Sequence, residues 1–144
     1  MTLNLTIVQR ERLLENGRRS AGNPHADPYP VVRIYDPDGN ASWFLAEIDP
    51  QNPHIAFGLC DLGLGYPELG SVSLDELGRV KGYAGMPMEV DRNFEGKAPL
   101  SIYAKAAQRL GRNVEPEETS VTAVFREWSG WADRPADTGK GGAA

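Results

Sequence analysis

The sequence predicts an α+β fold, in which an antiparallel sheet of about four or five strands carries two main helices packed on one side. Two aromatic and aliphatic segments, residues 42–48 and 55–60, are separated by a turn that contains two prolines. Two further segments, residues 7–16 and 99–110, carry apolar side chains at helical spacing. A chain of 144 residues, of which 40% are hydrophobic, has room for one such domain.

The first helix is expected over residues 7–16. Thr6 and Gln9 have the spacing of a capping box, and Gly17 is a typical helix-ending residue. The following residues, 20–30, are rich in turn formers and predict a loop.

Three strands are expected to form a meander over residues 31–60. Residues 36–39 spell Asp-Pro-Asp-Gly, a strong turn, between strands at 31–35 and 42–48, and the third strand covers 55–60. If Ile48 faces Ile55, side-chain alternation places one set of apolar residues on a single buried face. This set is Phe44, Ala46, Ile48, Ile55, Phe57 and Leu59.

The next segments predict smaller elements and a second main helix. A short strand near residues 71–72 precedes a one-turn helix, for which Ser73 and Glu76 form a capping box. Another strand is expected near residues 87–90. The helix over 99–110 begins at Pro99 and ends at Gly111.

We therefore assign residues 1–111 to a single α+β domain and residues 112–144 to a C-terminal extension. The extension is expected to be partly disordered, because the residues from Arg134 onward are small and polar. One apolar patch is expected to anchor it, either on its own domain or on a partner. This patch consists of Val124, Phe125, Trp128 and Trp131.

The charge is unevenly distributed. The net charge is -5, and residues 36–78 contain eight acidic residues but no Lys or Arg. This distribution disfavours direct binding of nucleic acid and favours an acidic surface for a protein partner, such as a basic enzyme that acts on nucleic acid. The alternative is that the mildly basic flanks fold against this segment and neutralise part of its charge.

The acidic residues also raise the alternative of a metal site. Glu47, Asp49, Asp61 and Glu68 are candidate ligands for Mg²⁺ or Mn²⁺. In the register above, Glu47 and Asp61 point in different directions, although a one-residue slip would reverse this. The leading hypothesis therefore has no cofactor and assigns no catalytic residue.

Aromatic residues are the remaining binding candidates. Trp43, Tyr66 and Tyr83 could stack on bases or, with Phe57, line a site for a small ligand, but the segment lacks interleaved Lys and Arg. Packing in the core is the alternative for each of them. No apolar run is long enough to cross a membrane and the N-terminus lacks the pattern of a secretory signal, so we expect a cytoplasmic protein.

Several strings of the sequence carry a family resemblance. They are Glu11 to Leu14 with Asn16-Gly17, Pro30 to Val32, Pro37 to Gly39, Trp43 to Pro50, Ile55 to Leu77, and Leu100-Ser101 with Tyr103-Ala104. Together they resemble the bacterial domain-of-unknown-function family numbered twenty-nine fifty-eight, whose members occur on plasmids and other mobile elements. The resemblance covers roughly residues 5–110.

The resemblance implies a family rather than an activity, and it supplies no catalytic motif that could be transferred to this chain. Our leading hypothesis is a non-enzymatic accessory protein of a mobile genetic element that binds a protein partner. Some members of the family carry a single-strand DNA endonuclease label, so the alternative is a metal-dependent nuclease that acts on single-stranded DNA.

Overall fold

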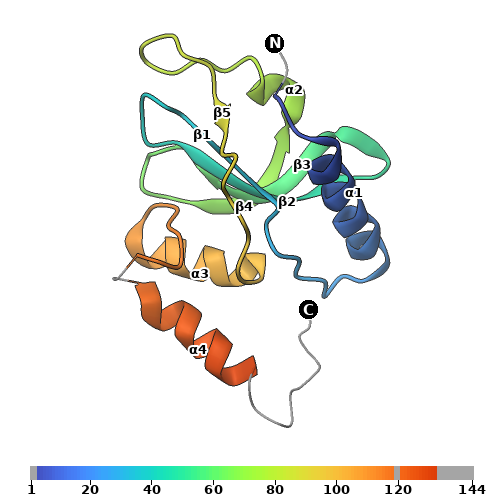
Figure 1. Cartoon of the computed structure of the whole chain (residues 1–144), viewed down its shortest axis with the longest axis vertical. Helices are drawn as coiled ribbons and strands as arrows, with labels where there is room; N and C mark the ends of the chain where they lie inside the picture. Colours follow the sequence, from blue (N-terminus) through green and yellow to red (C-terminus); the bar gives the residue numbers. More distant parts are fainter. Residues whose placement is uncertain (1–2, 119–120, 133–144) are drawn as a thin grey trace.

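The computed structural model of the chain describes residues 3–118 and 121–132, and the side chains through Trp128. It confirms an α+β fold with a five-stranded antiparallel sheet in the order β4-β3-β2-β1-β5 (Figure 1). The strands are β1 (Val32–Tyr35), β2 (Ser42–Asp49), β3 (Asn52–Asp61), β4 (Glu68–Ser73) and β5 (Glu89–Val90). The helices are α1 (Ile7–Gly22), α2 (Leu74–Leu77), α3 (Leu100–Leu110) and α4 (Thr122–Ala132).

Helix α1 begins as predicted but is longer than predicted. The Thr6 side chain accepts a hydrogen bond from the backbone of Gln9, and the Gln9 side chain accepts one from Thr6, so the capping box is confirmed. The helix then continues through Gly17, which is buried. A Cβ atom at Gly17 would overlap the carbonyl oxygen of Ile48 in β2. Gly17 therefore permits close packing of helix on sheet, and it does not end the helix.

The pairing of β2 with β3 agrees with the prediction at one end only. Phe44 lies opposite Leu59 as expected, but Leu45 pairs with Gly58 and Glu47 pairs with Phe57, so Ala46 is an extra residue in a β-bulge. Beyond the bulge, Ile48 pairs with Ala56 rather than Ile55. The predicted single face is therefore wrong for Ile48, because the bulge shifts the alternation by one residue.

The sheet has an apolar core on each face, because Phe44 and its neighbour Leu45 point in opposite directions. Phe44, Ala46 and Leu59 pack with the buried side of α3. Leu45 and Ile48 pack with Leu13 of α1 and with α2. The expectation that the two main helices share one side is thus corrected: α1 and α3 cover opposite faces, because β2 is apolar on both of its faces.

The C-terminal region folds against the face that carries α3. Val121, Val124 and Phe125 are buried in the same cluster as α3, and Trp128 packs against it with partial exposure. Figure 1 shows α4 beside α3, on the side of α3 away from the sheet. Two expectations lie outside the described part of the chain, namely the position of the Trp131 side chain and the disorder predicted from Arg134 onward.

The smaller elements fall near their predicted positions. The Ser73 side chain caps α2 by accepting a hydrogen bond from the Glu76 amide at 3.1 Å. Gly111 ends α3 with a left-handed φ of 74°. None of the described helices combines the length and apolar character needed to cross a membrane.

Candidate functional site

The four candidate metal ligands lie at two separate ends of the central strands. Glu47 and Asp49 are close to the β2–β3 turn, whereas Asp61 lies opposite Ser42 at the other end of β2. Five residues of strand separate Ser42 from Glu47, which corresponds to roughly 16 Å. Among the described residues, no group of three His, Cys, Asp or Glu side chains has the arrangement of a metal site.

Each of these carboxylates has a different environment. Glu47 accepts a hydrogen bond from the Ser20 hydroxyl at 2.7 Å, and Asp49 accepts one from the Gln51 amide in the turn at 2.9 Å. Glu68 is exposed at the start of β4. Asp61, in contrast, is only 1% exposed.

Asp61 connects two loops at the ends of the strands. Its carboxylate accepts hydrogen bonds from the backbone amides of Gly63 and Asn113, each at 2.8 Å. The Asn113 side chain donates to the carbonyl and hydroxyl oxygens of Ser42, both at 3.1 Å. The buried carboxyl group of Asp61 thus holds the loop after β3 against the chain that leaves α3, which is a structural role.

A polar hollow of about 610 Å³ lies beside Asp61 and is lined by both signs of charge. Arg33 lies over the Tyr35 ring at 4.7 Å and forms an ion pair with Asp91 at 3.2 Å. Arg112 forms an ion pair with Glu118 at 3.4 Å. Because both cations already have partners, the described residues that line the hollow offer no free positive charge to an anionic ligand.

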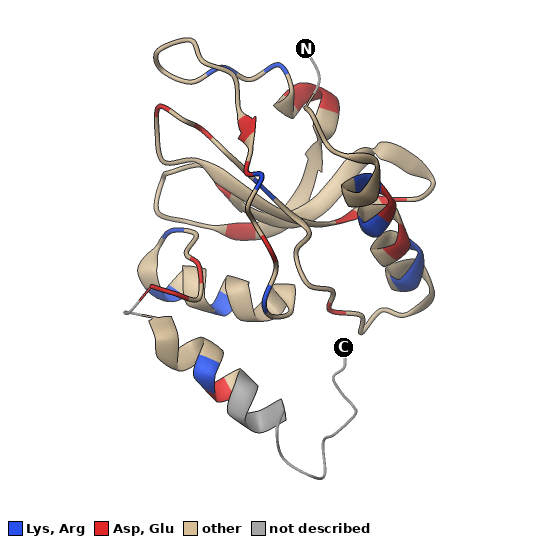
Figure 2. Cartoon of the chain, in the orientation of Figure 1, with Lys and Arg blue, Asp and Glu red and all other residues tan. Residues whose placement is uncertain are grey.

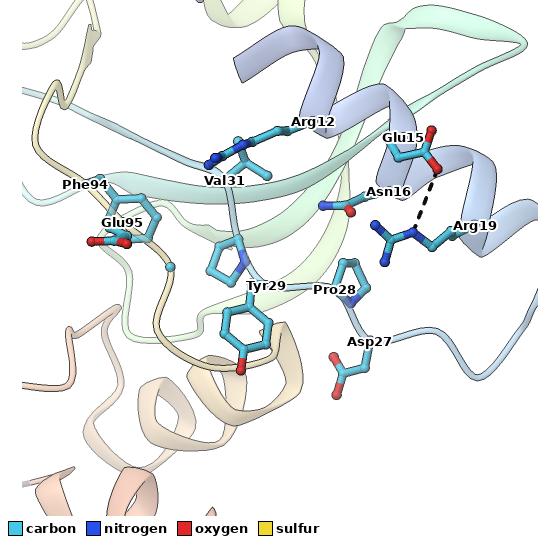
Figure 3. A pocket seen from close by; sticks show the side chains of 12 residues that line it. Arg12, Glu15, Asn16, Arg19, Asp27, Pro28, Tyr29, Val31, Phe94 and Glu95 are labelled. Atoms are coloured by element: carbon cyan, nitrogen blue, oxygen red, sulfur yellow. Dashed lines mark ion pairs between the residues drawn. The ribbon is translucent and has the colours of Figure 1, made fainter. Parts of the chain in front are cut away.

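A second hollow, of about 490 Å³, lies between α1 and residues 27–31 (Figure 3). Arg12 and Arg19 extend from α1 over this segment, with Asn16 between them. Glu15 lies 3.9 Å from Arg19, and the Asp27 carboxylate accepts hydrogen bonds from the Ser101 amide and hydroxyl. Sequence reasoning missed this hollow, although Arg12 and Arg19 are spaced to share one helix face. Three carboxylates and two guanidinium groups line it, so it has no single sign of charge.

The aromatic candidates do not form one site. Trp43 is 6% exposed in the core beneath α1, whereas Phe57 packs against the cluster on the opposite face of the sheet. The small-ligand site that combined them is therefore wrong in this form. Tyr83 is fully exposed on a separate loop, and Trp128 makes an edge contact with Tyr29 at 6.1 Å between ring centroids.

Tyr66 belongs to an exposed apolar group that sequence reasoning missed. Leu62, Leu64 and Leu69 accompany it, with 62%, 72% and 45% exposure, and Tyr66 itself is 79% exposed. We call these four residues the apolar loop patch. The alternating Leu-Gly-Leu-Gly-Tyr string of residues 62–66 is the feature of the sequence that could have indicated it.

The backbone conformation explains why these side chains are exposed. Gly63 and Gly65 have φ values of 81° and 94°, a region that side chains disfavour. The Asp61 carboxylate fixes the first of these turns through the Gly63 amide. The loop is consequently held in a shape that directs Leu62, Leu64 and Tyr66 toward solvent.

Three residues of the apolar loop patch lie in the loop before β4 and the fourth, Leu69, lies in β4. All four belong to the part of the chain that has no Lys or Arg. In Figure 2, β2, β3, β4 and α2 carry acidic residues and no basic ones. Cys60 lies opposite Glu68 in the β3–β4 pairing, and burial raises the pKa of its thiol. A thiol with a raised pKa is a poor nucleophile, so this surface is better suited to binding than to covalent chemistry.

Comparison with known proteins identifies a family without an assigned activity. A family model described as "Protein of unknown function (DUF2958)" matches residues 4–114. No curated protein and no solved structure matches the chain. The match covers the whole sheet with α1, α2 and α3, and it ends before α4. The chain therefore belongs to the DUF2958 family of proteins of unknown function.

Proposed function

We propose that the chain is a non-enzymatic accessory protein of a mobile genetic element that binds a basic protein partner through an acidic surface. The observation that carries the proposal is the apolar loop patch within a segment of eight acidic residues and no basic ones. The mobile-element setting is what the family resemblance implies. A basic enzyme that acts on nucleic acid is the kind of partner that the charge favours.

The apolar loop patch supports binding of a protein. Single exposed apolar side chains are ordinary, but several that lie close together mark interaction surfaces. Leu62, Leu64 and Tyr66 come from one loop, and Leu69 follows in the adjoining strand. Tyrosine is among the residue types that most often dominate the binding energy of protein interfaces, which favours Tyr66 as the central anchor.

The ion pairs support a partner of opposite charge. Where Lys or Arg forms an ion pair in the described part of the chain, the acids are Glu15, Asp91, Glu117 and Glu118. All four lie outside residues 36–78. Within that segment Asp61 is buried and Asp75 lies 3.2 Å from His54. Exposed carboxylates such as Glu68 and Glu76 are available to attract a basic partner, and salt should weaken this attraction.

The proposal is tested by affinity capture with the immobilised full chain at low and high salt. We expect a basic protein to be retained at low salt and released at high salt. A variant with Leu64→Ser and Tyr66→Ser should retain at least tenfold less of it, since each anchor contributes about 1 kcal/mol or more. A matched variant on another loop, Tyr83→Ser, should retain as much as the original chain.

Two results would contradict the proposal. One is the absence of any salt-sensitive partner. The other is equal retention by the original chain and by the variant without Leu64 and Tyr66, which would show that the apolar loop patch takes no part in binding.

A further inference from the structure

We propose that the partner binds as an extended, basic segment that adds to the free edge of β4 as a sixth strand. This inference rests on the proposed function and specifies how the surface recognises its partner. An extended segment at a sheet edge gains affinity from main-chain hydrogen bonds and specificity from alternate side chains.

Strand β4 offers the main-chain groups for this pairing. It ends the sheet and pairs with β3 along its whole length, from Ser73 opposite Ile55 to Glu68 opposite Cys60. In an antiparallel strand, every second residue directs its N–H and C=O away from the neighbour. Within the described residues, no backbone hydrogen bond joins β4 to a segment other than β3, and the Cys60 thiol of β3 donates to the Gly70 carbonyl at 3.9 Å.

The two edges of the sheet differ in how they are protected. At the far edge, β5 has only two residues and Pro87 lies just before it, features that limit pairing with another chain. At the near edge, β4 has six residues, and neither proline nor lysine occurs among them. Its pairing with β3 also runs without a bulge. The β4 edge is therefore the one suited to adding a strand.

The side chains beside this edge specify the character of the added segment. Alternation places Leu69, a member of the apolar loop patch, on the same face as its partner Leu59. Glu68 lies at one end of β4, and the exposed Asp75 and Glu76 lie at the other end on α2. Five residue steps separate the first and last residues of β4, which corresponds to roughly 16 Å. An apolar residue near Leu69 and a Lys or Arg at each end would complement this surface.

The acidic residues at the ends of β4 also disfavour a second copy of this chain as the added strand. Antiparallel pairing of β4 with β4 of another copy would bring Glu68 of one copy toward Asp75 and Glu76 of the other. Like charges placed opposite each other on paired strands are destabilising. A basic segment turns the same positions into attractive ones.

The test uses the full chain and a displayed library of random 12-residue peptides, selected at low salt. We expect enriched peptides to carry Lys or Arg about six residues apart, with an apolar residue between them. The best peptide is then made in two N-methylated forms, one methylated at even positions and one at odd positions. Only one form should lose binding, by more than about tenfold, because only alternate amides of the added strand face β4.

Charge variants supply a second readout. Glu68→Gln and Glu76→Gln should each weaken peptide binding by about two- to fivefold at low salt, and the effect should shrink at high salt. Glu11→Gln, an exposed acid on α1, is the matched control and should leave binding unchanged.

Three results would overturn the inference. Enrichment of no peptide, or binding that survives both methylation patterns, would exclude strand addition. A stable dimer of the chain that is dissociated by the peptide would show that a second copy occupies the edge. If strand addition fails while the captured basic partner still depends on Leu64 and Tyr66, the proposed function stands and only this binding mode is wrong.

Discussion

At the scale of single residues, Gly17 shows how close the helix and the sheet lie. The sequence predicted a helix-ending glycine, but the residue lies in the middle of α1 against the Ile48 carbonyl. Gly17→Ala should lower the free energy of unfolding by about 1–3 kcal/mol, since the added methyl group forces α1 away from β2. Urea unfolding measures this effect.

The control for this change is Gly22→Ala at the end of the same helix. A Cβ atom at Gly22 would meet no atom within 4 Å beyond its chain neighbours and the backbone of its own helix. Alanine there should leave the stability unchanged or raise it by about 0.4–1 kcal/mol, because it restricts the unfolded chain. Alanine favours the helix more than glycine does, so helix propensity alone would stabilise both variants. Equal destabilisation by both substitutions would therefore contradict the assignment of the Gly17 effect to packing against β2.

The buried hydroxyl group of Tyr103 makes the stability of the protein depend on pH in the alkaline range. Its hydroxyl accepts a hydrogen bond from the Lys97 amide at 3.0 Å, and burial raises its pKa to about 12. The folded state keeps the hydroxyl proton at a pH where the unfolded chain, with a pKa near 10, releases it. This contribution to stability is complete below pH 10 and is lost as the pH rises from 10 to 12.

Tyr103→Phe isolates that contribution. The variant should be less stable by about 1 kcal/mol at pH 7, because the Lys97 amide loses its acceptor. Between pH 10 and 12 its stability should fall less steeply than that of the original chain, as measured by urea unfolding at each pH. Parallel slopes for the two proteins would contradict the assignment, since the other tyrosines are common to both.

At the scale of elements, local signals predicted the existence of the strands and helices better than their details. The turn at residues 36–39 and the Thr6 capping box depend on neighbouring residues, and both were predictable. The bulge at Ala46 was not, because no residue type in the Ser42–Asp49 strand marks it. That strand is buried on both faces, so its sequence lacks the polar alternation that would have shown the shift.

The sequence predicted the acidic charge of the candidate site, but it did not predict which side chains are buried or exposed there. The absence of Lys and Arg from residues 36–78 is visible in the sequence. The role of Asp61 is not, because its partner Asn113 lies 52 residues further along the chain. The exposure of Leu62 and Leu64 depends on the turns at Gly63 and Gly65, whose effect on neighbouring side chains requires coordinates.

At the scale of the whole molecule, the C-terminal helix tests how many folding units the chain contains. The sequence placed a boundary at residue 111, and the family match ends at residue 114. Yet Phe125 of α4 is only 8% exposed and makes an edge contact with Tyr103 of α3 at 5.2 Å between ring centroids. Such burial makes α4 part of the core on that face of the sheet.

Phe125→Ala should therefore destabilise the entire chain. Removal of the ring should lower the free energy of unfolding by about 3–4 kcal/mol while unfolding remains one cooperative transition. In a background with Trp128→Phe and Trp131→Phe, Trp43 is the only tryptophan left and reports on the core of the opposite face of the sheet. Circular dichroism and tryptophan fluorescence of that variant should report the same midpoint. Arg126→Ala, at an exposed position on the same helix, should shift the midpoint very little. If residues 112–144 instead form an independent extension, Phe125→Ala will leave the fluorescence transition of the sheet unchanged.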